Sequence, residues 1–195
     1  MKKKVLILSL LAICAVIAAS GTLAYYTVSE RAHSVITTGS VNIEIEEWQD
    51  TGSGWTPYPS GQPIPAMPGV TVSKIATVRN NQAESYIRAK FDVVITDADG
   101  EAMELPAETL EGLVRIRVND SDWTRKAGDD QWWYYTAPVA RGAATEPLFT
   151  QVVFDGPNMT SEYQRCGVQV IVSAQAVQTA NNGADAAAAK GWPEA

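Results

Sequence analysis

The stretch from Ser85 to Asp97, SYIRAKFDVVITD, decides the fold class of this chain. Its apolar residues recur at every second position: Ile87, Ala89, Phe91, Val93 and Ile95. Polar or amphipathic residues fill the positions between them: Tyr86, Arg88, Lys90 and Asp92. Successive side chains of a strand point to opposite faces of a sheet, so this alternation predicts a half-buried β-strand.

Similar alternation recurs on both sides of this stretch, separated by turns rich in Gly, Pro and Asp. The expected strands lie at residues 41–46, 70–80, 113–120, 131–139, 147–154 and 165–178. Such a series of short strands favours an all-β fold, a jelly-roll-like antiparallel β-sandwich. The strands at 70–80 and 85–97 are separated only by a short loop, and we expect them to be antiparallel neighbours in one sheet.

Two other kinds of segment interrupt the strands. Residues 49–69 contain five prolines and four glycines, which predicts a long surface loop without strands. Short helices are expected at residues 107–112 and in the Ala-rich tail at 185–190. Asp97-Ala98-Asp99-Gly100 lacks the spacing of a calcium loop and predicts a turn.

The N-terminus has the features of an export signal. A basic start, Met1-Lys2-Lys3-Lys4, precedes an uncharged apolar run from Val5 to Ala19. Cleavage is expected after Ala24, which makes Tyr25 the first residue of the secreted chain, with cleavage after Ser20 as the second choice. An uncleaved transmembrane helix remains an alternative, since residues 5–24 number about the 20 that a bilayer requires.

Four parts of the chain are therefore expected. They are a signal peptide at 1–24, an N-terminal extension at 25–40, the β-sandwich domain at 41–180 and a C-terminal tail at 181–195. The expected location is outside the cell, at its surface or in its matrix.

Charge and cysteine content narrow the function classes. The full chain carries a net charge of −7, and loss of the three signal-peptide lysines moves the mature chain to −10. Such an acidic chain without a basic cluster disfavours nucleic acid as a partner. Cys166 becomes the only cysteine, so the sandwich must be held by its core rather than by intrachain disulfides.

Residues for catalysis are sparse. His33 is the single histidine of the chain, which leaves no second histidine for a zinc site and places any triad base near the mature N-terminus. Glu44, Glu46 and Glu47 lie on or beside the outer face of one expected strand, where solvated charge is the usual role. The sequence predicts a protein that is not an enzyme, with no cofactor and no metal.

Aromatic residues offer a better functional lead. Trp132, Trp133, Tyr134 and Tyr135 are consecutive, so two should enter the core and two should face outward. Together with Trp55 in the Pro-rich loop, Trp132 and Trp133 are candidate exposed contacts for a matrix or cell-wall polysaccharide, or for another subunit. The alternative is that these rings only fill the core and a sheet edge.

Several segments, taken in order, resemble the TasA/camelysin family of exported Gram-positive proteins, whose signal peptides are handled by the SipW signal peptidase. These segments are "GTLAYYTVSE", "TTGSVNIEI", "MPGVTVSKIATVRNN", "YIRAKF", "EPLFTQVVF" and "VQVIVSAQAVQTANN". The likeness covers most of the chain, although residues 97–130 match only as generic β structure.

The resemblance implies a subunit of biofilm-matrix or surface filaments with a jelly-roll-like sandwich. It implies that the freed N-terminal segment adds as a strand to the sheet of a neighbouring copy, so that the partner is a second copy of the chain. The expected donor strand lies within residues 25–38 and presents Tyr26, Val28, Val35 and Ile36. The alternative is that this segment folds back on its own sandwich.

Two other functions remain as alternatives. A glycan-binding surface adhesin would use the exposed tryptophans. A camelysin-like metallopeptidase is disfavoured, because the sequence contains no recognisable zinc motif.

Overall fold

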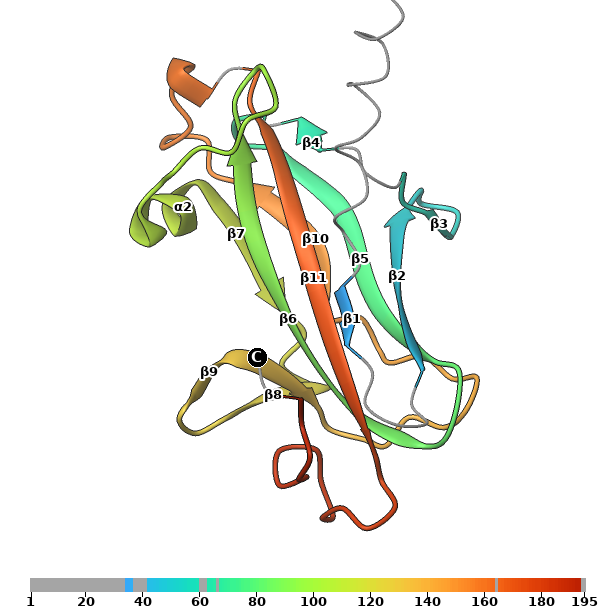
Figure 1. Ribbon diagram of the computed structural model, residues 1–195. Helices are drawn as coiled ribbons and strands as arrows, with labels where there is room; N and C mark the ends of the chain where they lie inside the picture. Colours follow the sequence, from blue (N-terminus) through green and yellow to red (C-terminus); the bar gives the residue numbers. More distant parts are fainter. Residues whose placement is uncertain (1–33, 37–41, 60–62, 66, 164, 194–195) are drawn as a thin grey trace, which may run out of the picture.

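The computed structural model describes residues 34–36, 42–59, 63–65, 67–163 and 165–193 (Figure 1). In these residues the elements follow the chain as β1 (Ser34–Ile36), β2 (Ile43–Asp50), β3 (Trp55–Pro57), β4 (Ile64–Pro65), β5 (Thr71–Asn80), β6 (Ser85–Thr96), α2 (Ala107–Leu113), β7 (Val114–Val118), β8 (Trp123–Lys126), β9 (Asp129–Tyr135), β10 (Phe149–Phe154), η2 (Ser161–Tyr163) and β11 (Gly167–Gln178).

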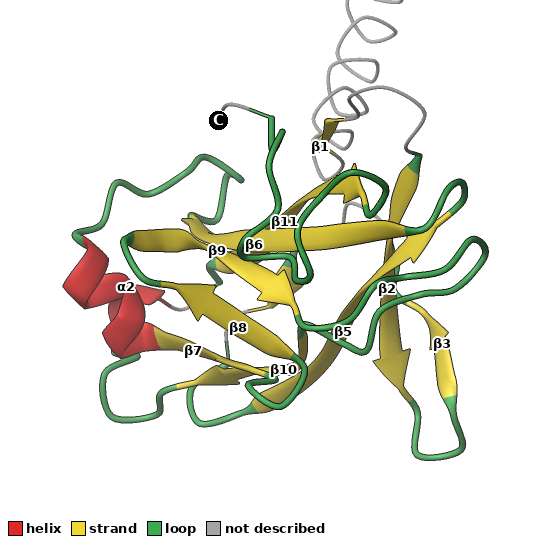
Figure 2. Cartoon of the chain, turned by 90° about the horizontal axis from the view of Figure 1, so that it is seen from below, coloured by secondary structure: helices red, strands yellow, loops and turns green. Residues whose placement is uncertain are grey.

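The strands form two sheets that pack face to face, which confirms the expected all-β sandwich (Figures 1 and 2). One sheet has the order β1-β11-β6-β9-β8, with β4 also paired to β11; we call it the β11 sheet. The other has the order β3-β2-β5-β10-β7, and we call it the β5 sheet. Neighbouring strands are antiparallel with one exception, because β1 runs parallel to β11.

The longest pairing joins β6 to β11 without a register shift, from Ser85 opposite Gln178 to Thr96 opposite Gly167. The alternation of apolar and polar residues in the sequence correctly predicts which face of each strand is buried. Odd-numbered residues of β6 and even-numbered residues of β11 face the β5 sheet, where they form the core. Core residues from these two strands include Ile87, Ala89, Ile95, Val168, Val172, Ala174 and Ala176.

The β5 sheet supplies the other half of the core. Its buried residues include Ile43, Ile45, Ala76, Val78, Phe149, Val152 and Phe154, and Phe91 of β6 meets Phe149 edge to face at 5.4 Å between ring centroids. The predicted helix at 107–112 is present as α2, at one end of the sandwich.

One expectation about neighbours is wrong: β5 and β6 lie in different sheets. The chain crosses between the two layers at residues 80–85, where Asn80 is fully buried. The Asn80 side-chain amide donates to the carbonyls of Ala83 and Val139, both at 2.8 Å. Alternation identifies which face of a strand is buried, but it does not identify the partner strand. A short loop can therefore join two layers that lie about 10 Å apart.

The Pro-rich segment 49–69 also differs from expectation. It contains β3, which forms a hairpin with β2, and β4, which pairs with the start of β11. Both strands lie at sheet margins. Proline lacks a backbone N–H, and it is tolerated at a margin because the N–H of a marginal strand can face away from its one neighbouring strand. The short strand β8 was likewise not predicted, and it forms a hairpin with β9.

The expected helix at 185–190 is not formed. Instead the tail makes turns that are fixed by side-chain acceptors: Asp185 Oδ1 accepts from the amide of Ala188 at 2.7 Å, and Asn182 Oδ1 accepts from Lys190 at 2.8 Å. The Asp185 and Asn182 side chains bind backbone amides that a helix would otherwise use, which favours turns over a helix here. The turns instead place Ala186 and Ala189 against the outer face of the β11 sheet.

These tail residues belong to a second, smaller apolar cluster, which we call the outer cluster. It consists of Tyr86, Trp132, Tyr134, Val177, Ala186 and Ala189, with Trp192 packed against it. The outer face of the β11 sheet is therefore partly covered by the chain's own C-terminal tail. Among the described residues, no helix is long and apolar enough to span a bilayer.

Candidate functional site

The residues expected to act in assembly fall partly within the described chain. Ala24, Tyr25, Tyr26 and Val28 lie outside it. Val35 and Ile36 lie in β1, which pairs in parallel with β11 of the same chain, with Ser34 opposite Ser173 and Val35 opposite Ala174. β1 occupies the margin of the β11 sheet and also contacts β2 of the opposite sheet (Figure 1).

This margin of β11 is shared by two short strands. β4 pairs with Gly167 and Val168, and β1 pairs with Ser173 to Gln175. Gln175 is 1% exposed, and its Oε1 accepts hydrogen bonds from Arg88 on the outer face of the sheet. The seat of β1, residues Ser173 to Gln175 of β11, is thus a sheet margin that pairs with a strand from the N-terminal region.

The predicted aromatic contacts are separated by the fold. Trp132 is 5% exposed and lies in the outer cluster, so the expectation that it is an exposed contact is wrong. It does face away from the main core, as alternation requires, but the C-terminal tail covers it. Trp133 and Tyr135 pack against the main core from the other face and are half-buried.

Trp133 also has a cationic neighbour. The Arg125 guanidinium lies 4.4 Å from the centroid of the Trp133 ring, so one region of that ring is covered by a charged side chain. Trp55, at the start of β3, is 50% exposed and is the one predicted aromatic contact that the fold leaves open.

Arg88 is the centre of the outer cluster, and the sequence did not single it out. Its guanidinium lies 4.4 Å from the Trp132 ring and 4.8 Å from the Trp192 ring. It donates to Gln175 Oε1 at 2.9 and 2.6 Å, to the Tyr134 hydroxyl at 3.2 Å and to the carbonyl of Pro193 at 3.0 Å. The sequence did contain a signal for this site. Arg88 lies between two apolar residues of its strand and so faces away from the core, and the row of aromatic residues at 132–135 offers rings that could cover it.

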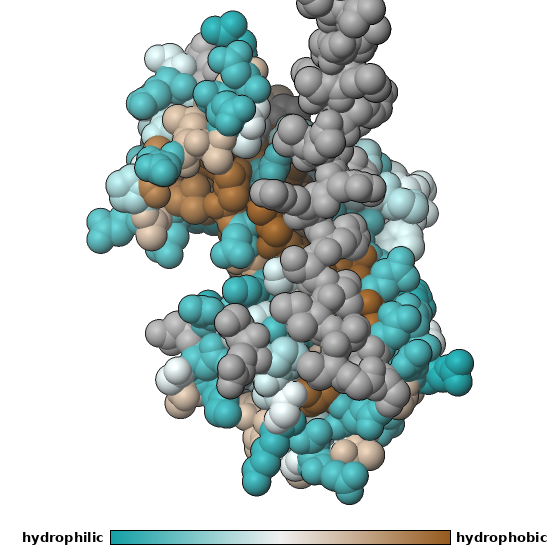
Figure 3. All heavy atoms as spheres, viewed as in Figure 1, coloured by the Kyte–Doolittle hydropathy of each residue, from teal (hydrophilic) through white to brown (hydrophobic). Residues whose placement is uncertain are grey.

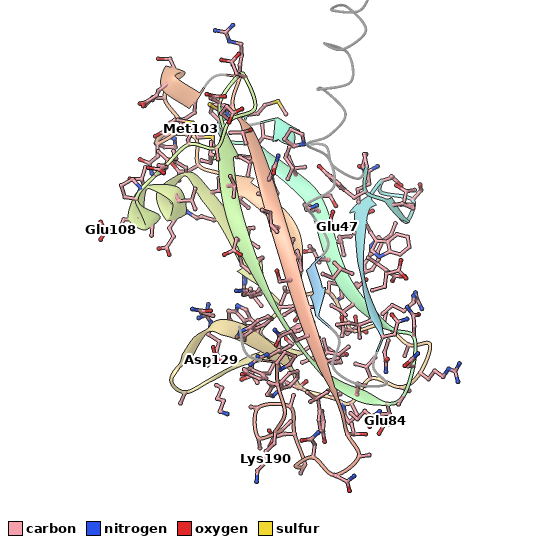
Figure 4. The ribbon with its side chains drawn as sticks, in the orientation of Figure 1. Glu47, Glu84, Met103, Glu108, Asp129 and Lys190 are labelled. Atoms are coloured by element: carbon pink, nitrogen blue, oxygen red, sulfur yellow. The ribbon has the colours of Figure 1, made fainter. Side chains whose placement is uncertain are left out.

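Asp129 completes this network (Figure 4). Its Oδ2 accepts a hydrogen bond of 2.6 Å from the Tyr134 hydroxyl. Burial by itself raises the pKa of Asp129, but the hydrogen bonds from Tyr134 and from the amides of Gln131 and Trp132 outweigh it, so the pKa lies below its usual value. Burial first, and then the bond to Asp129, raise the pKa of Tyr134.

Two acidic residues of β2, Glu46 and Glu47, are ion-paired. Glu46 binds Arg79 with 2.5 Å between Oε1 and Nε, and Glu47 binds Lys74 with 2.8 Å between Oε2 and Nζ. Glu47, which was expected on or beside the outer face with solvated charge, instead reaches inward to the buried Lys74. Figure 4 labels Glu47 between β5 and β2. Tyr58 covers this pair with its ring 4.2 Å from Lys74 Nζ.

Two hollows on the surface of the described chain bear on the candidate site. One, of 540 Å³, adjoins Trp55 and is lined by Asp50, Thr71, Ser73, Thr150 and Gln151 among others. The larger, of 740 Å³, opens between β6 and β7 and was not foreseen from the sequence. In the described residues, no group of three or more His, Cys, Asp or Glu side chains is placed to hold a metal ion.

Comparison of the chain with family models, with curated proteins and with solved structures finds no match.

Proposed function

We propose that this protein is an exported structural subunit of extracellular filaments, located at the cell surface or in the surrounding matrix. The signal peptidase releases the chain after Ala24, and residues 25–40 then act as a strand that one copy adds to the sheet of the next. The observation that supports the proposal is the pairing of β1 with Ser173 to Gln175 of its own chain. In this fold-back arrangement the margin of β11 accepts a strand from the extension, and the same margin could accept that strand from a second copy.

A strand in this position is suited to exchange between copies. β1 is three residues long and belongs to a terminal extension, while the sandwich core is built from β2 to β11. The same main-chain hydrogen bonds can be made by the identical segment of a second copy, so the intramolecular and intermolecular forms differ little in contact energy. Concentration and the geometry of the connecting residues then decide which form dominates.

Exchange of the N-terminal strand between copies would also explain how a filament grows. A copy that donates its extension at one place and receives a strand at another makes a head-to-tail contact, which builds an open filament when the rotation does not close. The partner is therefore a second copy of the chain, with matrix or cell-wall polysaccharide as a further partner of the finished filament.

The proposal is tested by a cysteine pair at the seat of β1. Val35 lies opposite Ala174 in the register, and paired Cα atoms of adjacent strands fall within the span of a disulfide. In assembled Val35→Cys/Ala174→Cys protein, oxidation is expected to give a ladder of covalently linked chains on non-reducing gels. The native Cys166 is buried and should not compete.

Two controls accompany this test. A Val35→Cys/Thr124→Cys pair places the second thiol on β8 at the far side of the sheet and should give no ladder. A chain without residues 25–36 should be secreted as a folded protein that forms no filaments under negative-stain electron microscopy. Only intrachain disulfides in assembled filaments, or filaments of normal yield from the deletion, would refute the proposal.

A second function, binding of polysaccharide, is favoured by one observation. Trp55 stands beside a hollow lined with hydroxyl, amide and carboxylate groups, a combination that suits a sugar ring and its hydroxyls. Binding to immobilised wall polysaccharide that is lost in Trp55→Ala, without any change in assembly, would favour this function over a purely structural one.

A further inference from the structure

The 740 Å³ hollow between β6 and β7 is a cleft at an open margin of the sandwich. β9 pairs with β6 at Arg88 and Ala89 and then diverges, so it leaves residues 90–94 of β6 without a strand partner on that side. In the other sheet, β7 is the last strand in the described order. Figure 3 shows the result as a notch between two lobes, with apolar atoms exposed on its upper wall.

The floor of this cleft is apolar. Phe91, Val93, Val114 and Ile116 line it from the two sheets, and Leu110 lines it from α2. Phe91, Val93, Ile116 and Leu110 are only half-buried although they pack against the main core, so the core continues to the surface here. An apolar floor of this kind gains free energy when another apolar group removes it from water.

The backbone of β6 also faces the cleft. Ser85 exchanges both backbone hydrogen bonds with Val139 on the β9 side, and on the same side Ile95 O accepts from Met103. Regular alternation along β6 therefore directs the backbone groups of Phe91 and Val93 toward the cleft. No strand in the described part of the chain pairs with β6 there, so the groups are open to an extended segment of a partner.

The rim of the cleft is more basic than the chain as a whole. Lys90, Arg115 and Arg125 line it together with Asp92 and Glu111, whereas the chain carries a net charge of −7. Arg115 is paired with Asp155 and Arg125 stacks on Trp133, so both are positioned side chains. A partner that combines an apolar anchor with a carboxylate would match this cleft.

The hairpin of β2 and β3 carries that combination. Trp55 is 50% exposed, and Asp50 is its partner across the hairpin. The Asp50 carboxylate accepts from the amide of Gly52 at 2.8 Å, and it makes no ion pair with any described residue. The turn is fixed by bonds from the amide and hydroxyl of Thr51 to Gly54 O, at 3.0 and 2.9 Å. Little entropy is lost when such a preorganised tip docks.

The hairpin and the cleft lie on opposite sides of the molecule. Figures 1 and 2 both place β3 at one side and α2 with β7 at the other. One copy therefore cannot fill its own cleft with its own hairpin, whereas a second copy can. Because the two surfaces differ and face away from each other, the contact is head to tail and continues from copy to copy.

We propose that the β2–β3 hairpin of one copy docks Trp55 into the cleft between β6 and β7 of a second copy. Trp55 covers the apolar floor, and Asp50 faces the basic rim formed by Lys90, Arg115 and Arg125. The margin of β3 lies along the open backbone of Phe91 and Val93. This contact goes beyond strand donation: it is a reversible association that does not use the N-terminal extension, and filaments still require the donated strand.

The test uses the secreted chain as the oxidised Val35→Cys/Ala174→Cys monomer, in which β1 cannot exchange, and two variants made in that background. Trp55→Ala removes the anchor, and Gln131→Trp fills the cleft from an exposed position on its rim. Sedimentation velocity over a concentration series should show self-association weakened about 30-fold or more in each variant, the factor expected for a hot-spot residue. Met67→Ala is the matched control, because Met67 is 46% exposed but lies outside the hairpin and the cleft.

Mixing provides the decisive result. Gln131→Trp protein keeps an intact hairpin and Trp55→Ala protein keeps an intact cleft, so an equimolar mixture should give one-to-one dimers that do not grow further. Near-ultraviolet circular dichroism of each variant should match the wild type. Unchanged self-association of both folded variants, or a mixture that stays monomeric, overturns the proposal.

Two further experiments distinguish this contact from strand exchange and from polysaccharide binding. Val35→Cys/Ala174→Cys protein oxidised as a monomer cannot exchange β1, and it should still associate through the hairpin. If Trp55→Ala loses binding to wall polysaccharide but keeps full self-association, Trp55 is a sugar platform and the proposal is wrong.

Discussion

At the scale of single residues, Arg88 determines how the outer face of the β11 sheet is built. A buried guanidinium requires acceptors and stacking partners, and Gln175, Tyr134 and the carbonyl of Pro193 supply the acceptors. The rings of Trp132 and Trp192 lie against it at 4.4 and 4.8 Å. One residue thereby joins β6, β9, β11 and the C-terminal tail.

Asp129 makes this network sensitive to acid. Its folded-state pKa lies below the ordinary value of 3.8, so its contribution to stability is present above that value and is lost as the pH falls through the lower, folded pKa. Urea unfolding between pH 5 and pH 2.5 should therefore show a shallower loss of stability for Asp129→Asn than for the wild type. The exposed Asp120→Asn should keep the wild-type slope, and an equal change in both variants would contradict this role.

At the scale of elements, the C-terminal tail is a covering segment rather than a helix. Trp192 fixes it by stacking on Arg88, by an edge contact of 5.7 Å with the Tyr134 ring, and by donating from Nε1 to the carbonyl of Ala186 at 3.3 Å. The tail keeps Trp132 out of solvent, which explains why a row of aromatic residues leaves no large exposed patch on this face.

Trp192→Ala should loosen this covering. Loss of the cation–π contact, the ring pair and the hydrogen bond is expected to lower the free energy of unfolding by about 2 kcal/mol. Hydrogen exchange of residues 183–193 should become faster, and Trp132 fluorescence should shift to the red as water reaches it. The exposed Trp55→Ala should change stability by less than about 0.5 kcal/mol. Tail exchange at the wild-type rate in Trp192→Ala would show that other contacts hold the tail.

The elements also differ in how far the sequence predicted them. Strong alternation predicted β6 and β11 with their buried faces, because both strands have one face on the core and one outside it. β3 and β4 were missed because proline obscures a strand at a sheet margin. The tail helix is absent because the side chains of Asp185 and Asn182 bind backbone amides and fix turns instead. The β5–β6 pairing failed because partner choice depends on the whole sandwich.

At the scale of the whole molecule, the proposed filament requires a defined order of events in export. In this proposal the N-terminal extension can reach a neighbour only after it is cut from the apolar segment before it. The secreted chain is therefore expected to begin at Tyr25, as measured by mass spectrometry of its N-terminal peptide.

Ala24→Leu should block that cut, because a bulky side chain does not fit the small-residue pocket expected of a signal peptidase. The uncut protein should remain in the membrane fraction, and negative-stain images should show no filaments. Leu23→Ala is the matched control and should be processed normally. A wild-type chain that begins at Gly21, or filaments from membrane-retained protein, would contradict this order of events.

As with the strands and helices, the sequence predicted some candidate sites and missed others. The sequence indicated the N-terminal extension, including Val35 and Ile36, and indicated Trp55 as an exposed ring. It did not indicate the cleft between β6 and β7, whose lining residues come from strands far apart in the chain. It also treated Trp132 and Trp55 alike, although the fold buries one and exposes the other.

The sequence by itself determined the all-β class, the strands with strong alternation and the face that each of them buries, because these follow from local periodicity. Only the tertiary structure decided which strands are neighbours, that β1 lies parallel to β11, that the tail covers Trp132, and that β6 and β7 leave an open cleft. These features depend on how two twisted sheets share one core and on where their margins fail to meet, and no local pattern along the chain encodes that.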